Sequence, residues 1–279
     1  MSQKSYDNKP SLYLIPTPIG NMEDITIRAI NILKQVDIIF SEDTRETLKL
    51  LNYLEINKKL VSCHKFNEDK IYIKVIESLK EGLNVGLVTD RGTPIISDPG
   101  YVVSYNVIKE GFNVIALPGP TAFVPALITS GLNPNKFLFY GFLDSKKSLK
   151  RKQLEKIKNL EYTLIFYESP FRIKETIELI RDIFGERQIS LSREISKKYE
   201  EIYRGTPSEV LLELIEPKGE FVLIVDGNNE EENYDNIDII EHINKLIKDN
   251  ISEKEAIKKV AKLHKLDKNT VYMKYKNNK

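Results

Sequence analysis

Short, continuous apolar runs alternate with amphipathic segments along residues 11–225. A continuous apolar run is typical of a parallel strand that helices cover on both faces, whereas apolar positions three or four apart are typical of a helix. In the first half of the chain the apolar runs fall at residues 11–15, 36–40, 59–63, 85–88 and 113–117. Amphipathic segments separate them, so this half predicts an α/β fold with a mainly parallel sheet and helices on both faces.

The second half repeats the alternation with one change. The expected strands are residues 137–140, 162–166, 188–191, 200–203 and 221–225, and the expected helices are residues 122–129, 149–160, 173–183 and 208–215. The run at 200–203 is followed by Gly205 and indicates a hairpin with its predecessor, so this sheet is expected to be mixed. Asp24 and Ser208 precede helical patterns and are expected to be N-caps.

The composition changes near the C-terminus. Residues 228–238 are polar and acidic, which is typical of a linker. Ser252 and Glu255 then have the spacing of a capping box, and Asp267 precedes a further apolar pattern, which together predict a small helical module of the helix-turn-helix kind. Residues 251–279 hold nine lysines and three acidic residues, a local charge of +6. The expected domains are 10–120, 121–228 and 229–279.

Overall composition narrows the class of protein. A chain of 279 residues with 41% hydrophobic residues suits two packed domains, and a net charge of +1 gives no general attraction to nucleic acid or membranes. The single cysteine, Cys63, excludes an internal disulfide, and three histidines do not favour a zinc site, so no metal is expected. A polar N-terminus and the lack of an apolar run of about 20 residues predict a cytoplasmic protein that does not enter the membrane.

Four turns at the ends of expected strands carry the unusual residues of the first half. They lie at residues 16–21, 41–45, 89–100 and 117–122, and the carboxyl ends of parallel strands meet at one edge of a sheet. Residues 89–100, TDRGTPIISDPG, combine carboxylates, hydroxyls, prolines and glycines in a stiff loop, with Asp98 expected as a helix N-cap and Pro99 as the first helical residue. Residues 141–143 and 167–170 of the second half are expected to face these turns across a cleft that binds a small molecule.

Several common catalytic and phosphate-binding motifs are missing. The chain contains no GxxxxGK[ST] loop, no GxGxxG after the first strand and no GxSxG turn. Cys63 and His64 are adjacent in an expected strand and therefore point to opposite faces, which excludes a nucleophile–base pair. Catalysis by positioning a bound, already activated cofactor is the interpretation that remains.

A family resemblance accounts for these motifs. The segments that carry it include LYLIPTPIGNMEDITIRAI, SEDTRETLKLL, VTDRGTPIISDPG, LPGPTA, TLIFYESPFRI and SREISKKYEE, in that order and spacing. Together they resemble the bacterial small-subunit rRNA cytidine-2′-O-methyltransferases, members of the tetrapyrrole methylase superfamily, over residues 12–226. The resemblance implies two α/β domains of the tetrapyrrole methylase type, S-adenosylmethionine bound in the cleft between them, and a homodimer. The implied substrate is a cytidine ribose in the decoding region of 16S rRNA, within the small ribosomal subunit.

The resemblance also implies roles for particular residues. Carried over by position, the implied cofactor contacts are Pro18, Ile19, Asp90, Gly92, Thr93, Thr121, Ala122 and Tyr167. A carboxylate with a raised pKa can accept the proton of the ribose hydroxyl, and Asp43 and Glu168 are the candidates, with Glu42 behind them. The structural alternative for each is a helix cap or an ion pair with Arg45 or Arg172.

Basic residues near the expected cleft are candidates for rRNA contacts. Residues 144–158 hold seven basic and two acidic side chains, a local charge of +5. Each neutralised phosphate adds salt-dependent affinity, and a planar guanidinium suits phosphate oxygens. The residues expected to contact rRNA are Arg45, Arg172, Lys150 and Arg151.

Two departures from the family pattern keep other functions open. Arg91 stands where the family usually has alanine in SDAGTP, and Phe171 stands where it has histidine in YESPHR. A guanidinium beside a sulfonium is repulsive, so a catalytically impaired relative that still binds the small subunit is one alternative. A methyltransferase acting on a small corrin-type ring is another, and the basic segments argue against it.

Overall fold

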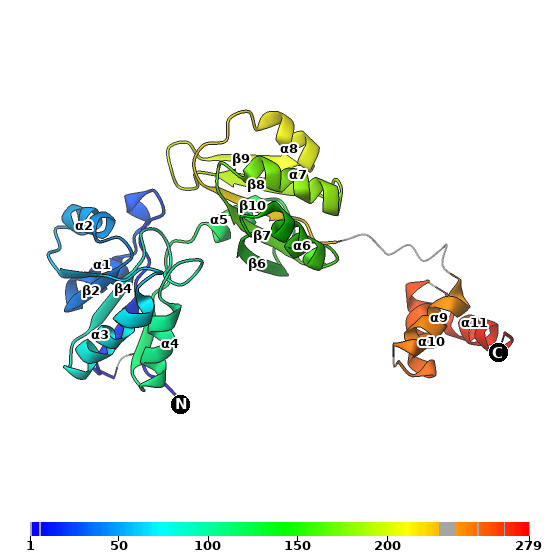
Figure 1. The fold of residues 1–279 in the computed structure, drawn as a ribbon, viewed down its shortest axis with the longest axis horizontal. Coiled ribbons are helices and arrows are strands. Elements are labelled where there is room, and N and C mark those ends of the chain that lie inside the picture. The colour runs from blue at the N-terminus through cyan, green and yellow to red at the C-terminus, as the bar shows by residue number, and fades with distance from the viewer. Residues whose placement is uncertain (1, 6, 229–237, 250, 265, 279) are drawn as a thin grey trace. The chain divides into compact units, whose positions relative to one another are not determined.

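The computed structural model describes residues 2–5, 7–228, 238–249, 251–264 and 266–278. The chain forms two compact units, residues 1–228 and 229–279. The first unit contains two five-stranded sheets, and the elements around each sheet are called the first lobe and the second lobe below (Figure 1). The boundary expected at residue 120 within this unit stays a prediction.

The sheet of the first lobe is wholly parallel, as the continuous apolar runs predict. Its strands are β1 (Ser11–Leu14), β2 (Ile38–Ser41), β3 (Lys59–Ser62), β4 (Val85–Val88) and β5 (Asn113–Ala116), in the order β3-β2-β4-β1-β5. Because β4 lies between β2 and β1 at the centre, the turns after these strands lie side by side at one edge of the sheet.

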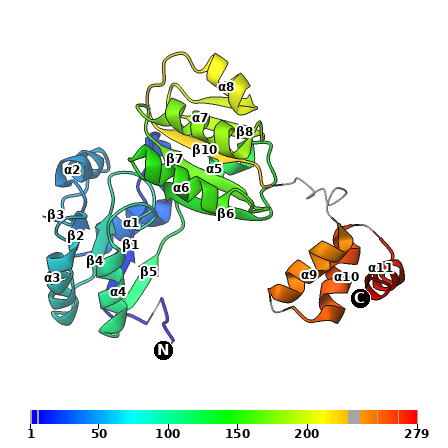
Figure 2. The same ribbon diagram turned by 45° about the vertical axis from the view of Figure 1, so that its right-hand side comes forward.

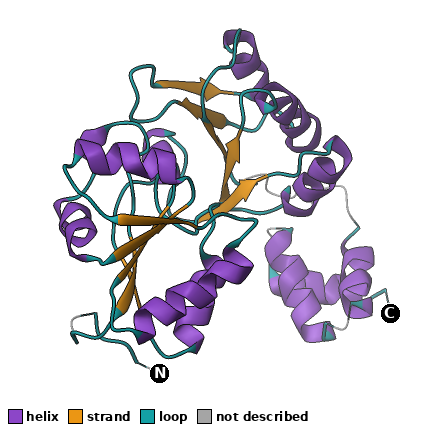
Figure 3. Ribbon diagram, turned by 60° about the vertical axis from the view of Figure 1, so that its left-hand side comes forward, coloured by secondary structure: helices purple, strands orange, loops and turns teal. Residues whose placement is uncertain are grey.

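Helices cover both faces of this sheet (Figure 3). The helices are α1 (Ile27–Gln35), α2 (Thr44–Tyr53), α3 (Glu68–Lys80) and α4 (Tyr101–Lys109), and a short 3₁₀ helix, η1 (Met22–Asp24), precedes them. Apolar side chains of α3 and α4 pack on one face, and those of α1 and α2 pack on the other. Phe40, fully buried in β2, and Leu33 of α1 belong to these two cores.

The sheet of the second lobe is mixed, as predicted. Its strands are β6 (Phe137–Phe142), β7 (Thr163–Glu168), β8 (Ile189–Arg193), β9 (Glu201–Gly205) and β10 (Phe221–Val225), in the order β6-β7-β10-β8-β9. Only the β6–β7 pair among them is parallel. Helices α6 (Lys147–Ile157), α7 (Ile173–Phe184) and α8 (Pro207–Glu213) pack on one face, and α5 (Phe123–Thr129) packs on the other (Figure 2).

The second unit is a bundle of helices with its own core. Its described helices are α9 (Ile239–Lys248), α10 (Glu253–Leu263) and α11 (Lys268–Lys276). Ser252 and Asp267 cap α10 and α11 as expected, but α9, capped by Asp238, is absent from the sequence-based prediction. The expected linker at 228–238 falls almost wholly outside the described residues. No helix in the described ranges is long and apolar enough to cross a membrane.

Three of the expected helix caps are wrong. Thr26 caps α1, and Asp24 lies in the preceding 3₁₀ turn; Thr206 caps α8 in a capping box with Glu209, and Ser208 lies inside that helix. In both helices the hydroxyl of a threonine two residues from the expected cap accepts a hydrogen bond from one of the first free N–H groups. The third error concerns Asp98, which belongs to the functional site.

Candidate functional site

A pocket of about 210 Å³, partly open to solvent, is lined by both lobes. Its partly enclosed shape suits a small-molecule ligand. The first part of the chain contributes Ile19, Arg91, Gly92, Thr93, Ile96, Ser97, Asp98, Thr121 and Ala122; the second lobe contributes Phe142, Tyr167, Glu168, Ile195, Glu220, Phe221 and Val222. Apolar walls therefore surround a small set of hydroxyls and charged groups.

The four turns that were expected to converge are joined by hydrogen bonds. The backbones of Thr17 and Gly92 exchange two hydrogen bonds, of 2.9 and 3.0 Å, and the Thr93 hydroxyl donates to the Pro120 carbonyl at 3.0 Å. The backbone N–H of Asp43 donates to the Asp90 carboxylate at 2.9 Å. Residues from four separate turns are thus joined by hydrogen bonds, and two of them, Gly92 and Thr93, line the pocket.

The 89–100 loop has an unusual backbone. Ile95 and Ser97 have φ of 77° and 68°, in the left-handed region that side chains with a Cβ rarely adopt. Gly100 has φ of 121°, and a Cβ there would lie 2.7 Å from the Leu87 side chain, so only glycine fits. Such strain persists where surrounding contacts over-determine the conformation, which is common at functional sites.

This backbone places Asp98 in the pocket, and the prediction that it caps a helix is wrong. Helix α4 begins at Tyr101 behind the N-cap Gly100, whose N–H donates to the Glu68 carboxylate at 2.9 Å. The left-handed residues turn the chain, so Asp98 is directed to the pocket instead. Burial, together with the negative charges of Glu42 and Asp90, raises the pKa of Asp98 from 3.8 to about 7.

Tyr167 lines the opposite side of the same pocket from β7. Burial raises the pKa of its hydroxyl to about 12, with a further contribution from the charge of Asp98. Its ring packs edge-on against Phe139 and Phe142, with centroids 5.1 and 5.6 Å away. Tyr167 is therefore a neutral, fixed side chain that lies near Asp98 across the lobes.

Asp43 does not have the raised pKa expected of a general base. Its carboxylate caps α2 by accepting the Arg45 N–H at 2.8 Å, and it forms an ion pair with the Arg45 guanidinium at 2.6 Å. The hydrogen bonds from the side chain and backbone of Arg45 lower the pKa of Asp43 to about 2. The structural alternative, a cap and an ion pair, describes this residue, and Arg45 is also engaged there.

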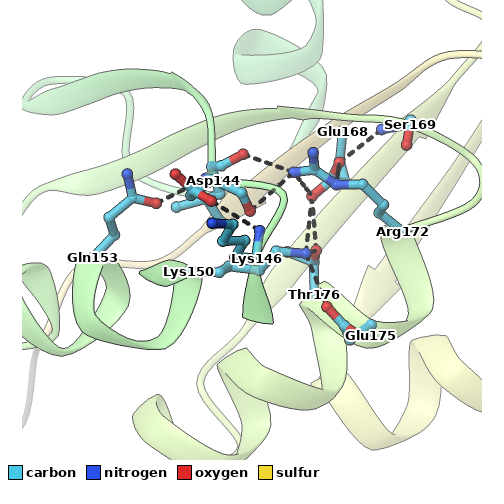
Figure 4. A network of polar contacts seen from close by, with 10 residues as sticks. Asp144, Lys146, Lys150, Gln153, Glu168, Ser169, Arg172, Glu175 and Thr176 are labelled. Atoms are coloured by element: carbon cyan, nitrogen blue, oxygen red, sulfur yellow. Dashed lines mark hydrogen bonds and ion pairs between the residues drawn. The ribbon is translucent and has the colours of Figure 1, made fainter. Parts of the chain in front are cut away.

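Glu168 is the centre of a buried polar network at the end of β7 (Figure 4). Its carboxylate accepts hydrogen bonds from the Ser169 N–H at 2.9 Å and the Thr176 hydroxyl at 2.7 Å, and it forms an ion pair with the Arg172 guanidinium at 2.9 Å. Lys150 lies 3.7 Å from the same carboxylate. With these donors around it, Glu168 serves to join β7 to α6 and α7.

The expected contact between Lys150 and rRNA is wrong. Lys150 is 0% exposed, and its ammonium group donates to Thr176 at 2.9 Å and to Glu175 at 3.2 Å. A fully buried ammonium group compensated by these partners cannot reach a phosphate. Arg172 also donates to the Leu143 carbonyl at 2.7 Å, whereas Arg151 lies at the surface near Asp182.

Arg91 lines the pocket but its charge is compensated. Its guanidinium forms an ion pair with Glu220 of the second lobe at 2.7 Å, and Lys197 donates to the other oxygen of Glu220 at 2.9 Å. Both Arg91 and Glu220 are more than half exposed, so the pair lies at the rim. Arg91, which replaces the alanine of the family pattern, therefore links the two lobes through this ion pair. Phe171, the other departure, is 97% exposed.

The expected cofactor contacts divide into two groups. Six line the pocket: Ile19, Gly92, Thr93, Thr121, Ala122 and Tyr167. Pro18 is buried outside the lining, and Asp90 is exposed beside Asp43. The sequence-based prediction missed Asp98, Ser97 and Glu220 in the lining. Ser97 and Asp98 both lie in the 89–100 loop, and the unusual composition of that loop was the signal in the sequence that could have identified them.

The lining suits S-adenosylmethionine. This molecule combines a flat adenine ring, a polar amino-acid end and a sulfonium cation, which is best accommodated by oxygen atoms. Ile19, Ile96 and Phe142 give apolar contact surface, while Thr93 and Asp98 supply oxygens. Within the described residues no group of three or more His, Cys, Asp or Glu side chains is arranged to bind a metal ion.

Comparisons with known proteins point to one family. The sequence family of tetrapyrrole (corrin/porphyrin) methylases matches residues 11–211. A Bacillus subtilis protein named ribosomal RNA small subunit methyltransferase I is 45% identical, with 98% of this chain and 97% of that protein covered. A Streptococcus pyogenes serotype M1 protein of the same name is 40% identical over 98% of each chain.

Solved structures agree on the fold. Uroporphyrin-III-C-methyltransferase from Thermus thermophilus superposes with a TM-score of 0.54 at 18% identity, covering 78% of this chain and 94% of that chain. A cobalt precorrin-4 methyltransferase superposes with a TM-score of 0.56 at 15% identity, covering 77% and 94%.

Proposed function

The chain belongs to the tetrapyrrole methylase family, and on that premise we propose that it methylates the ribose 2′-oxygen of a cytidine in the decoding region of 16S rRNA. It is a methyltransferase, and its methyl donor is S-adenosylmethionine. The observation that supports the rRNA substrate is the likeness to small-subunit rRNA methyltransferases along nearly the whole chain, which includes the basic C-terminal unit.

The described residues can bind the cofactor and orient it. Ile19, Ile96 and Phe142 of the lining would offer apolar surface to its adenine ring, and Thr93 and Thr121 would offer hydroxyl oxygens to its polar groups. When bound, S-adenosylmethionine supplies an electrophilic methyl group. The protein then contributes mainly by holding the acceptor hydroxyl in line with that methyl group and by excluding water, which removes much of the entropic cost of reaction.

The surface charges of the second lobe suit an RNA substrate. Helix α6 follows the pocket residue Phe142. Lys146, just before the helix, and Lys147 and Lys152 on it are exposed, with Arg151 half-exposed. These side chains take the place of the buried Lys150 as candidates for phosphate contacts. The alternative of a small corrin-type substrate does not use such a basic surface beside the pocket.

Mapping the methyl group tests the proposed position. Small subunits lacking the modification are incubated with the protein and tritiated S-adenosylmethionine, and the 16S rRNA is hydrolysed in alkali. We expect the label in an alkali-resistant dinucleotide that begins with cytidine, because a 2′-O-methyl group prevents cleavage of the next phosphodiester bond. Label in ordinary mononucleotides would place the methyl group on a base and contradict the ribose assignment.

Arg91 supports one further candidate, a relative that binds the small subunit without transferring methyl groups. Its guanidinium lines the pocket, although Glu220 compensates the charge. Cofactor binding measured by calorimetry distinguishes the two functions. Binding by the wild-type protein supports the active enzyme, whereas binding that appears only in the Arg91→Ala variant supports the impaired relative.

The homodimer that the family resemblance implies is also part of the proposal. Large apolar side chains such as Ile27, Tyr105 and Ile128 are exposed on the first unit, between 54% and 78%. Light scattering after size-exclusion chromatography is expected to give a mass twice that of the 32.2 kDa chain, and a monomer mass at micromolar concentration would contradict the dimer.

A further inference from the structure

Asp98 is a pocket carboxylate that no hydrogen bond or ion pair engages within the described part of the chain. We propose that Asp98 is the general base that accepts the proton of the acceptor hydroxyl during methyl transfer. This inference rests on the proposed function and adds a catalytic residue to it. Of the carboxylates expected from the sequence, Asp43 and Glu168 are engaged in ion pairs, and Glu42 lies outside the pocket lining.

Glu168 and Glu220, the other acidic side chains of the described lining, are already occupied. Glu168 accepts hydrogen bonds from Ser169 and Thr176 and pairs with Arg172. Glu220 pairs with Arg91 at 2.7 Å and with Lys197 at 2.9 Å. Of the three carboxylates in the described lining, only Asp98 keeps its oxygens available to a ligand. A general base needs such a free oxygen within hydrogen-bond reach of the substrate.

The backbone holds Asp98 in this position. Ser97, immediately before it, has φ of 68°, and Gly100, two residues after it, has φ of 121°. The Gly100 N–H is bonded to Glu68, and Gly141 of the second lobe packs so closely on Ser97 that a Cβ there would lie 3.0 Å from the Ser97 hydroxyl. A strained loop that is held by contacts on both sides fixes the orientation of a side chain, so that little reorganisation is needed for catalysis.

The surrounding charges tune the proton affinity of Asp98. Its half-buried position and the nearby carboxylates of Glu42 and Asp90 raise its pKa to about 7, so a large fraction is ionised at neutral pH and it can still hold a proton. The other charged or titratable side chains of the pocket are Arg91 on the same loop and Tyr167, Glu168 and Glu220 on the second lobe.

Atoms, electrons and charge balance in the proposed methyl transfer. The ribose 2′-oxygen forms a bond to the methyl carbon, the bond between that carbon and the sulfonium sulfur breaks with its electron pair going to sulfur, and the hydroxyl proton passes to an Asp98 carboxylate oxygen. The products are the 2′-O-methyl ribose, a neutral thioether and a protonated Asp98, which returns its proton to water. No oxidant, reductant or metal ion is consumed.

The test compares Asp98→Asn with the wild-type protein in methyl transfer to isolated small subunits. We expect kcat at saturating cofactor to fall about 100-fold or more, while the Kd for S-adenosylmethionine measured by calorimetry rises less than about tenfold, because the carboxamide keeps an oxygen in the pocket but loses the charge. In the wild type, log kcat should rise with pH and level off near or below pH 7, because the base must be ionised and the bound sulfonium favours ionisation. That inflection should disappear in Asp98→Asn. The matched control is Glu110→Gln, an exposed carboxylate at the other end of α4 that pairs with Lys80.

The following results would overturn the inference. A kcat within about fivefold of wild type, or an unchanged pH inflection, shows that another group accepts the proton. A large loss of cofactor affinity with kcat at saturation unchanged makes Asp98 a cofactor ligand instead. If Asp98→Asn fails to fold, Asp98→Ser is measured in the same way. An inactive wild type that binds no cofactor defeats the proposed function itself, and the inference with it.

Discussion

Asp43 and Asp98 lie in two turns at the same edge of the first sheet, yet their surroundings shift their pKa values in opposite directions. The Arg45 side chain and backbone lower that of Asp43 to about 2, while burial and two neighbouring carboxylates raise that of Asp98 to about 7. When the surroundings separate the pKa values of two carboxylates in this way, one stays ionised in a structural role and the other can exchange a proton in catalysis.

The raised pKa of Asp98 has a consequence for stability. The native protein binds this proton more tightly than the unfolded chain, whose pKa is near 3.8, so the free energy of unfolding falls as pH rises from about 4 to about 7. Asp98→Asn should therefore raise the free energy of unfolding at pH 8 by on the order of 2 kcal/mol, after allowance for partial exposure, and leave it nearly unchanged at pH 4. Urea denaturation at the two pH values checks this. An equal gain at both would exclude the titration as its cause.

The Arg91–Glu220 pair gives a second prediction. Glu220→Gln removes the charge that compensates the guanidinium, so the affinity for the cationic cofactor should fall about threefold to tenfold, more strongly at low salt. Calorimetry measures the change. The matched control is Glu216→Gln, which removes an exposed partner of Lys218. In an Arg91→Ala background Glu220→Gln should have a smaller effect, because only the pairing with Lys197 remains to be lost, and an undiminished loss there would contradict the explanation.

Sequence patterns located most of this site but not its key carboxylate. Gly92, Thr93, Thr121 and Tyr167 were reached through the family resemblance, and all four line the pocket. Asp98 was assigned to a helix cap because Asp followed by Pro is a common helix start. The assignment is wrong because Ile95, Ser97 and Gly100 have positive φ, which the local sequence does not indicate, and helix α4 begins only at Tyr101 behind Gly100.

At the scale of elements, the network around Glu168 joins β7 to helices α6 and α7. Lys150→Met keeps the aliphatic stem but leaves the buried carboxylate with one cation fewer, so the free energy of unfolding should fall by about 3 kcal/mol. Chemical denaturation provides the measurement. Lys147→Ala, an exposed lysine on the same helix, should change the value by less than about 0.5 kcal/mol. Equal effects of the two variants would show that burial of Lys150 is not the cause.

The strands and most helices could be predicted because apolar periodicity and burial agree in them. The errors arose where charged or polar residues concealed the apolar spacing of a helix. Lys150, Leu154 and Ile157 are the buried residues of α6 and have the spacing of one helix face, so the sequence did contain the signal that Lys150 points inward. The basic composition of the helix concealed it. Helix α9 was missed because its apolar pattern follows directly on the expected polar linker.

At the scale of the whole molecule, the compact C-terminal unit and residues 1–228 have separate cores. A chain ending at Asn228 should fold and bind the cofactor with unchanged affinity. Its KM for small subunits should rise about tenfold at 0.1–0.2 M salt, because the basic unit no longer contacts phosphates. Steady-state kinetics at several salt concentrations measure the effect. An unchanged KM with the same salt dependence would exclude the unit from substrate binding.

Transfer of tritiated methyl groups from S-adenosylmethionine to isolated, unmodified small ribosomal subunits tests the central claim most directly. We expect the wild-type protein to transfer one methyl group per subunit into 16S rRNA. An absence of transfer, by protein that is folded and binds the cofactor, would contradict the claim.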